Sequence, residues 1–196
     1  MSLLSSLFGS DSSGTLDPRE LERLEEEART ARAGHKGAPL NRAGDLAYRA
    51  GQTDRALGYY GRAIDAYLED QHLDAARGLA NKIVRLHPEA VRTLCTLTWL
   101  DIAARHMATA LLHLRDYVEA AERSRHHDLA AEQIHRMARL APFPEFLSSA
   151  ADALDQLDHE EKAAEVREWI KAEGSPHVIR ENDALAEACM NAATRA

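Results

Sequence analysis

An internal repeat at an offset of 54 residues constrains the fold of this chain more than any other sequence feature. Residues 37–88 align without a gap with residues 91–142, and twelve of the 52 aligned pairs are identical. The identical positions are spread over the whole length of the alignment. Similarity at a fixed period of this size is typical of repeat proteins, in which each copy buries its apolar face against the next. The sequence therefore predicts an array of similar helical copies.

The composition agrees with a helical array. Hydrophobic residues make up 45% of the chain and aromatic residues only 5%, while alanine is abundant and glycine and proline are sparse. Such a composition is typical of helices that pack closely through small side chains. Strand signals are nearly absent. We therefore predict an all-α fold.

The net charge of -8 lies mostly outside the repeat. Residues 145–196 hold 5 basic and 12 acidic residues, whereas residues 37–144 hold 14 and 13. A nucleic-acid partner is not expected, because such binding requires a basic face. A basic peptide or protein suits the charge better. Two cysteines without a C-x-x-C motif favour a reducing cytoplasm, and neither a signal peptide nor an integral membrane segment is expected.

Breaks in the helical pattern of the sequence predict that the chain has four parts. Residues 1–16 form a flexible tail, although Leu3, Leu4, Leu7 and Phe8 lie at helical spacing and would also suit docking onto a partner, a neighbouring subunit or the chain's own groove. Residues 17–38 form an N-terminal helix and a linker. The repeat array covers residues 39–174. Residues 175–196 form a C-terminal capping helix.

Each copy of the repeat is expected to hold three helices. Two further helices, a weaker third copy, should begin at Phe146 and end near Gly174. The expected helices of the first copy are 39–50, 53–70 and 73–87, and those of the second are 89–105, 107–124 and 128–140. The helix over 89–105 is apolar almost all round, which is typical of a centrally buried helix.

The small and large residues of the first copy follow a familiar pattern. Gly44 and Ala56 are small where two antiparallel helices cross, and Leu40 and Tyr60 fill the space beside them. This spacing resembles the tetratricopeptide repeat, and the chain is similar to bacterial helical-repeat proteins of that family. The resemblance covers roughly residues 39–173. It implies a right-handed α-solenoid of antiparallel helix hairpins with about nine helices. The closing proline of the family is missing at Leu68, so the middle helix serves two overlapping repeats.

The resemblance also implies a function, a non-catalytic scaffold or adaptor that binds a partner protein or peptide in a groove. The groove residues of the family correspond here to Asn41, Asp45 and Tyr48, and the 54-residue offset maps them to Cys95, Trp99 and Ile102. Trp99 is favoured as a core residue over a groove residue. The candidate partner-binding residues are Asn41, Asp45, Tyr48, Trp99 and Ile102.

One departure from the family narrows the expected partner. Some members hold a C-terminal carboxylate with asparagine and basic side chains, whereas this chain has Asp45 just after Gly44, where the clamp needs asparagine. A carboxylate would be repelled there. Internal segments, helices or basic ligands are therefore better candidates than a C-terminal tail.

No motif in the sequence indicates an enzyme, a cofactor or a metal site. Phosphate-binding glycine loops and nucleophile motifs are absent, and the ten histidines do not have the spacing of helical metal ligands. His126 and His127 are expected at a turn between helices. The leading alternative function is a structural or oligomerisation subunit of a larger complex. A helical metal-dependent hydrolase is the third hypothesis.

Overall fold

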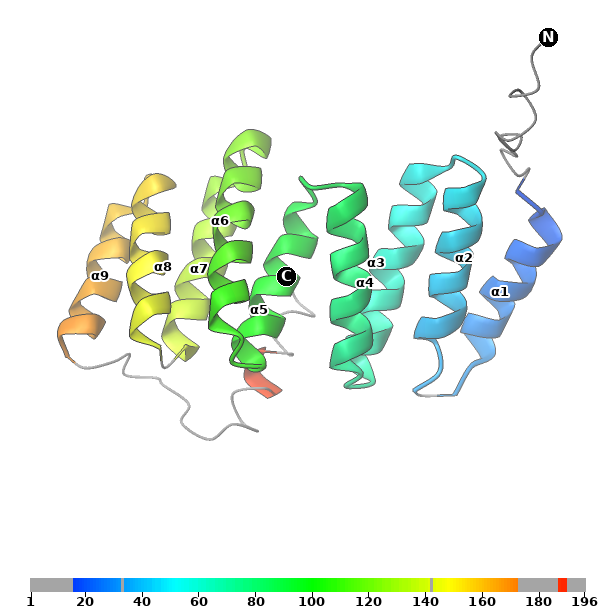
Figure 1. Ribbon diagram of the computed structural model, residues 1–196, viewed down its shortest axis with the longest axis horizontal. Helices are drawn as coiled ribbons and strands as arrows, with labels where there is room; N and C mark the ends of the chain where they lie inside the picture. The colour runs from blue at the N-terminus through cyan, green and yellow to red at the C-terminus, as the bar shows by residue number, and fades with distance from the viewer. Residues whose placement is uncertain (1–15, 33, 142, 173–186, 190–196) are drawn as a thin grey trace, which may run out of the picture. The chain divides into compact units, whose positions relative to one another are not determined.

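The computed structural model describes residues 16–32, 34–141, 143–172 and 187–189, and all the regular structure in them is α-helical, which confirms the all-α prediction. Most of the predicted tail, with its Leu3 to Phe8 segment, and most of the predicted capping helix lie outside these residues. Glu187–Cys189 is a short helical stretch. The nine longer helices of the described part are α1 (Pro18–Thr30), α2 (Gly37–Arg49), α3 (Thr53–Glu69), α4 (Leu73–Leu86), α5 (Val91–Ala103), α6 (Met107–Ser124), α7 (His127–Leu140), α8 (Pro144–Gln156) and α9 (Glu160–Lys171) (Figure 1).

The three-helix organisation of each repeat copy agrees with the prediction. Helices α2 to α4 and α5 to α7 begin and end within two residues of the predicted bounds. The two helices predicted after Phe146 correspond to α8 and α9. The period of the sequence therefore corresponds to a period of three helices.

Five turns in the described part share one geometry. In each, a residue with positive φ follows the helix, and the N–H of the next residue donates to the carbonyl five positions earlier, as in a Schellman motif. The positive-φ residues are Gly51, Gln71, Arg105, Arg125 and Asp158. In four of these turns the next residue is a histidine at the N-cap position of the following helix, without a side-chain hydrogen bond to that helix, namely His72, His106, His126 and His159.

The chain divides into two compact units, residues 1–63 and 64–196, and the boundary falls within α3. In the N-terminal unit, α1 packs against α2 through buried Leu21 and Leu24. Asp17 begins α1 by accepting a hydrogen bond from the backbone N–H of Arg19 at 3.0 Å. The hydroxyl of Tyr59 donates to Glu25 on α1, so polar contacts also hold α1 in this unit.

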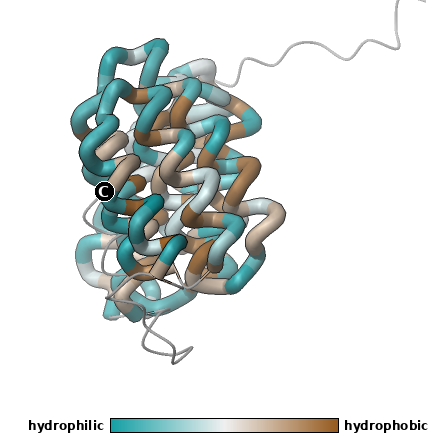
Figure 2. Tube along the Cα trace, turned by 90° about the vertical axis from the view of Figure 1, so that its left-hand side faces the viewer, coloured by the Kyte–Doolittle hydropathy of each residue, from teal (hydrophilic) through white to brown (hydrophobic). Residues whose placement is uncertain are grey.

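In the C-terminal unit, α4 to α9 follow one another as antiparallel neighbours (Figure 1). Helices α5, α6 and α7 also contact the second helix along, respectively α7, α8 and α9. Hydrophilic and hydrophobic stretches alternate along the helices (Figure 2), as expected for helices with one buried face. Helix α5 is the exception, because every residue from Leu94 to Ile102 is buried. Its predicted central position is confirmed.

Candidate functional site

Three of the predicted partner-binding residues lie on one face of α2. Asn41, Asp45 and Tyr48 follow the i, i+4, i+7 spacing of a helical face. The Tyr48 side chain is 42% exposed. Asp45 Oδ1 accepts a hydrogen bond of 2.8 Å from the Tyr60 hydroxyl, and Asn41 Oδ1 is shielded from solvent without a hydrogen-bond partner. The face thus combines an exposed aromatic ring with polar oxygens, and its role in binding stays a prediction.

The two predicted residues on α5 are not at the surface. Trp99 and Ile102 are both 0% exposed, and the Trp99 indole N–H donates to Oε1 of Gln133 on α7 at 3.3 Å. This burial agrees with the alternative assignment of Trp99 to the core. Neither side chain offers a surface to a partner in this structure.

A buried carboxylate on α5 organises a polar cluster in the C-terminal unit. Asp101 is 2% exposed, and its Oδ2 accepts a hydrogen bond of 2.7 Å from Nδ1 of His113 on α6. Its Oδ1 lies 3.8 Å from the guanidinium of Arg77 on α4. Arg77 also donates to Nδ1 of His106 at 2.6 Å and to Asp74 at 3.1 Å. Because an arginine only donates, His106 carries its proton on Nε2. The cluster joins α4, α5 and α6.

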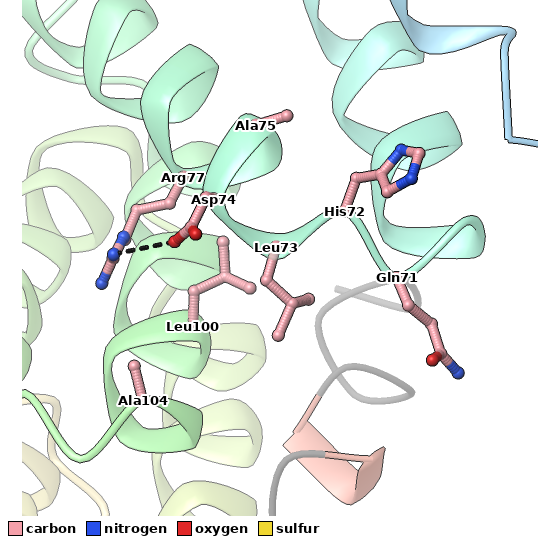
Figure 3. Close-up of a pocket in the computed structure, with 8 residues that line it drawn as sticks. All are labelled: Gln71, His72, Leu73, Asp74, Ala75, Arg77, Leu100 and Ala104. Carbon is pink, nitrogen blue, oxygen red and sulfur yellow. Dashed lines mark hydrogen bonds and ion pairs between the residues drawn. The ribbon is translucent and has the colours of Figure 1, made fainter.

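An open cavity of about 580 Å³ lies next to this cluster, and we call it the turn cavity (Figure 3). Its apolar lining comes from the start of α4 and the end of α5, where Leu73 lies beside Leu100. Arg77 and Asp74 form one side, and Gln71 and His72 lie on the opposite side. The complete lining is Gln71, His72, Leu73, Asp74, Ala75, Arg77, Leu100 and Ala104. The cavity suits an apolar side chain with polar groups around it.

Sequence reasoning did not find the turn cavity, although the repeat alignment held a signal for the cluster beside it. Asp101 and His113, which bond to each other, align with Ala47 and Tyr59 in the first copy. Both positions of this contacting pair therefore differ between the copies. The cavity itself gave no signal, because it depends on the relative placement of helix ends.

Three of the five histidines in the second copy have side-chain partners among the described residues. His113 pairs with Asp101, and His135 Nε2 lies 2.9 Å from Oε2 of Glu165. His106 accepts a hydrogen bond from Arg77, and His106 and His126 occupy the N-cap positions of α6 and α7 without a side-chain hydrogen bond to the helix. Among the described residues, no group of three or more histidine, cysteine, aspartate or glutamate side chains is placed to hold a metal ion. The expectation that metals and cofactors play no part stays a prediction.

Comparisons of the chain with protein-family models, with curated proteins and with solved structures return no match. The tetratricopeptide resemblance therefore rests on the residues of the repeat alone. Within the described helices, none combines the length and the apolar character needed to cross a membrane.

Proposed function

We propose that this chain is a non-catalytic helical-repeat protein that binds a partner protein. Its architecture would be that of a tetratricopeptide-like right-handed α-solenoid built from antiparallel hairpins. Three features support this architecture: the 54-residue repeat of three helices, the shared turn geometry, and the contacts of each helix with its next neighbours in the C-terminal unit. Solenoid proteins use extended surfaces to bind other proteins.

The turn cavity carries the functional part of the proposal. At about 580 Å³ it has room for one or two side chains of a partner. Leu73 and Leu100 would contact the apolar part of such an anchor, and Asp74 and Arg77 would contact the polar groups beside it. Pockets that receive an apolar anchor are where binding energy concentrates in protein interfaces.

The chemistry around the site favours an internal segment of the partner over a C-terminal carboxylate. Arg77, the basic residue of the lining, is already paired with Asp74, whose side chain is 96% exposed, and lies 3.8 Å from Asp101. Among the residues that line the cavity, no unpaired cation is therefore left to hold a terminal carboxylate, and Asp74 would attract a basic side chain. The cytoplasm, where such peptides are accessible, is the proposed compartment.

A single substitution can block the turn cavity without disturbing the core. Ala75 is exposed and lines the cavity, so Ala75→Trp would fill the entrance while the helix stays intact. Ala164→Trp, at an exposed position on α9 outside the lining, is the matched control. The experiment is quantitative affinity capture from a lysate of the native organism with the wild type, both variants and Tyr48→Ala, followed by mass spectrometry.

The proposal predicts that at least one protein captured by the wild type and by Ala164→Trp is depleted about tenfold or more with Ala75→Trp. A photo-crosslinking amino acid at position 75 should join the same protein covalently. If Ala75→Trp captures every protein as well as the wild type does, the turn cavity is not the binding site and the proposal loses its main support.

A further inference from the structure

The short helical stretch near the C-terminus, Glu187–Cys189, has one buried side and one exposed side. Cys189 is only 1% exposed, whereas Glu187 is exposed. Burial raises the pKa of the Cys189 thiol to about 12, as expected for a thiol removed from water. Three helical residues are too few to shield one of their own side chains to this extent. Cys189 therefore packs against other residues of the C-terminal unit, to which it belongs.

This stretch lies beside the turn cavity. In Figure 1 it is the short red helix next to the end of α5, and in Figure 3 the same helix lies beside the lining residues, below Leu73 in the view. Residues 172–186 separate it from α9. A chain of that length spans up to about 50 Å, which is enough to pass α8, α7 and α6 at about 10 Å per helix. The chain can therefore return to the cavity within one molecule.

The chemistry of the stretch matches that of the cavity. Leu73 and Leu100 supply the apolar part of the lining. In the sequence, residues 184–193 hold a single charged residue, Glu187, which is the exposed one, and are otherwise mostly alanine with one leucine and one methionine. Removal of such apolar surface from water is favourable. The buried side of the stretch thus suits the apolar lining, while its charge stays in solvent.

We propose that the C-terminal segment around Cys189 is an intramolecular ligand of the turn cavity and competes with the partner protein for it. A tethered segment acts at a high effective concentration. If it is docked for about nine-tenths of the time, the apparent affinity for the partner falls about tenfold. The docking itself needs no partner, whereas its regulatory role rests on the proposed function of the turn cavity.

The Cys189 thiol reports the docking directly, because Cys95 is the one other cysteine of the chain. The full-length protein is alkylated with iodoacetamide at about pH 8, and mass spectrometry follows each cysteine separately. A synthetic peptide of residues 180–196 gives the rate of the undocked segment. We expect Cys189 to react about tenfold or more slowly than the peptide, since only the undocked fraction is open to the reagent. In Glu187→Cys, the thiol introduced at the exposed position should react about as fast as the peptide.

Leu73→Asp tests where the segment docks. Leu73 is half-buried in the first turn of α4, where an aspartate is compatible with the helix dipole, so the fold should be retained. Loss of the apolar contact should speed the alkylation of Cys189 about fivefold or more. Leu129→Asp is the matched control, because Leu129 is 53% exposed in the first turn of α7 and lies outside the turn cavity. It should leave the rate unchanged, and melting curves establish that both variants are folded.

Affinity capture tests the competition with a partner. Cys189→Glu places a charge at the buried position and should release the segment. It should therefore capture about threefold or more of the protein that Ala75→Trp depletes, relative to the wild type. Glu187→Gln changes the exposed side of the same stretch and should capture the wild-type amount.

Three results would overturn the inference. Alkylation of Cys189 as fast as that of the peptide, or equal rates in the wild type and folded Leu73→Asp, would exclude docking at the turn cavity. Unchanged capture by folded Cys189→Glu would exclude the competition. Alkylation is measured without a partner, so it decides the docking even if Ala75→Trp captures every protein. That outcome counts against the partner-binding proposal and leaves the docking result standing.

Discussion

Gly44 and Tyr60 show how contacting residues differ in pairs between the two repeat copies. A Cβ atom on Gly44 would clash with the ring of Tyr60, so the tyrosine requires a glycine opposite it. The corresponding residues of the second copy are Thr98, which is larger than glycine, and Leu114, which is smaller than tyrosine. Both positions have changed together, which preserves close packing. Two other contacting pairs of the second copy also differ at both positions from their counterparts. Asp101 and His113 correspond to Ala47 and Tyr59 of the first copy. Cys95 and Tyr117 correspond to Asn41 and Ala63.

Gly44→Thr should therefore destabilise the protein strongly. The new side chain cannot fit beside the fully buried Tyr60 ring, and overpacking of this kind costs about 1–3 kcal/mol of the free energy of unfolding. Urea unfolding followed by circular dichroism measures the loss.

The double variant Gly44→Thr with Tyr60→Leu reproduces the pair found in the second copy. We expect it to be more stable than the sum of the two single effects predicts, by about 1 kcal/mol or more, although Tyr60→Leu also loses the hydrogen bond to Asp45. Additive effects in this double-mutant cycle would show that the two residues do not constrain each other.

The buried thiol on α5 predicts a loss of stability at alkaline pH. Burial raises the pKa of Cys95 from 9.0 to about 12, and the pKa of its neighbour Tyr117 is raised as well, chiefly by burial. At a pH between 9.0 and about 12, the Cys95 thiol loses its proton in the unfolded chain and keeps it in the folded chain. The folded state then binds more protons, so the free energy of unfolding falls as the pH rises, by up to about 1.4 kcal/mol per pH unit for this thiol.

Urea unfolding at several pH values from about 8 to about 10.5 checks this dependence. Cys95→Ala should lower stability near pH 8 because it removes buried volume, but its stability should fall less steeply with pH. A slope unchanged by Cys95→Ala would mean that this thiol does not contribute to the alkaline loss.

At the scale of elements, the shared turn determines where most helices end. A non-glycine residue in the left-handed region is strained, yet Gln71, Arg105, Arg125 and Asp158 all adopt it. The following N–H reaches back to the preceding helix in every case. Sequence patterns located these turns from the repeat period and from Gly51, but they did not indicate that the four non-glycine residues share its conformation.

Glycine should stabilise the protein at a turn position with positive φ and destabilise it at a position inside a helix. Arg125→Gly and Asp158→Gly should each raise the free energy of unfolding by about 0.5–1 kcal/mol, because glycine adopts positive φ without strain. Gly51→Ala should lower it by about 1 kcal/mol. A Cβ at Gly51 would meet nothing within 4 Å, so the backbone conformation is the sole cause.

Gly58→Ala is the matched control for these turn variants. A Cβ at this position within α3 also meets nothing within 4 Å, and alanine is the better helix former, so stability should rise by about 1 kcal/mol. Thermal unfolding of the four variants measures both the expected gains and the expected loss of stability. A rise in stability with Gly51→Ala would contradict the strain argument.

At the scale of the whole molecule, the repeat period predicted the helices of both copies, because it recurs in packing positions that are close in sequence. The buried character of α5 followed from the apolar residues on all its sides. The candidate site was less predictable. Asn41, Asp45 and Tyr48 were inferred from a family pattern, whereas the turn cavity arises where the start of α4 lies beside the end of α5. A periodic pattern does not encode such contacts.

The oligomeric state distinguishes the two leading functions. A scaffold that binds a different protein should be monomeric by itself, so light scattering should give a molar mass near 21.7 kDa at every concentration. A stable dimer or larger assembly would instead favour the alternative of a structural subunit, and would make the exposed side of α2 around Tyr48 the first place to test for self-contact.

The position of the two prolines has a consequence for how chains of this kind change in length. Pro88 and Pro142 occupy equivalent positions of the repeat alignment, and the links that follow α4 and α7 come after equivalent helices of the two copies. Recombination at these links inserts or deletes three complete helices and leaves every shared turn inside a copy intact. Length variation would then proceed in steps of 54 residues, and each step would add one more set of helix ends at which a new binding cavity can form.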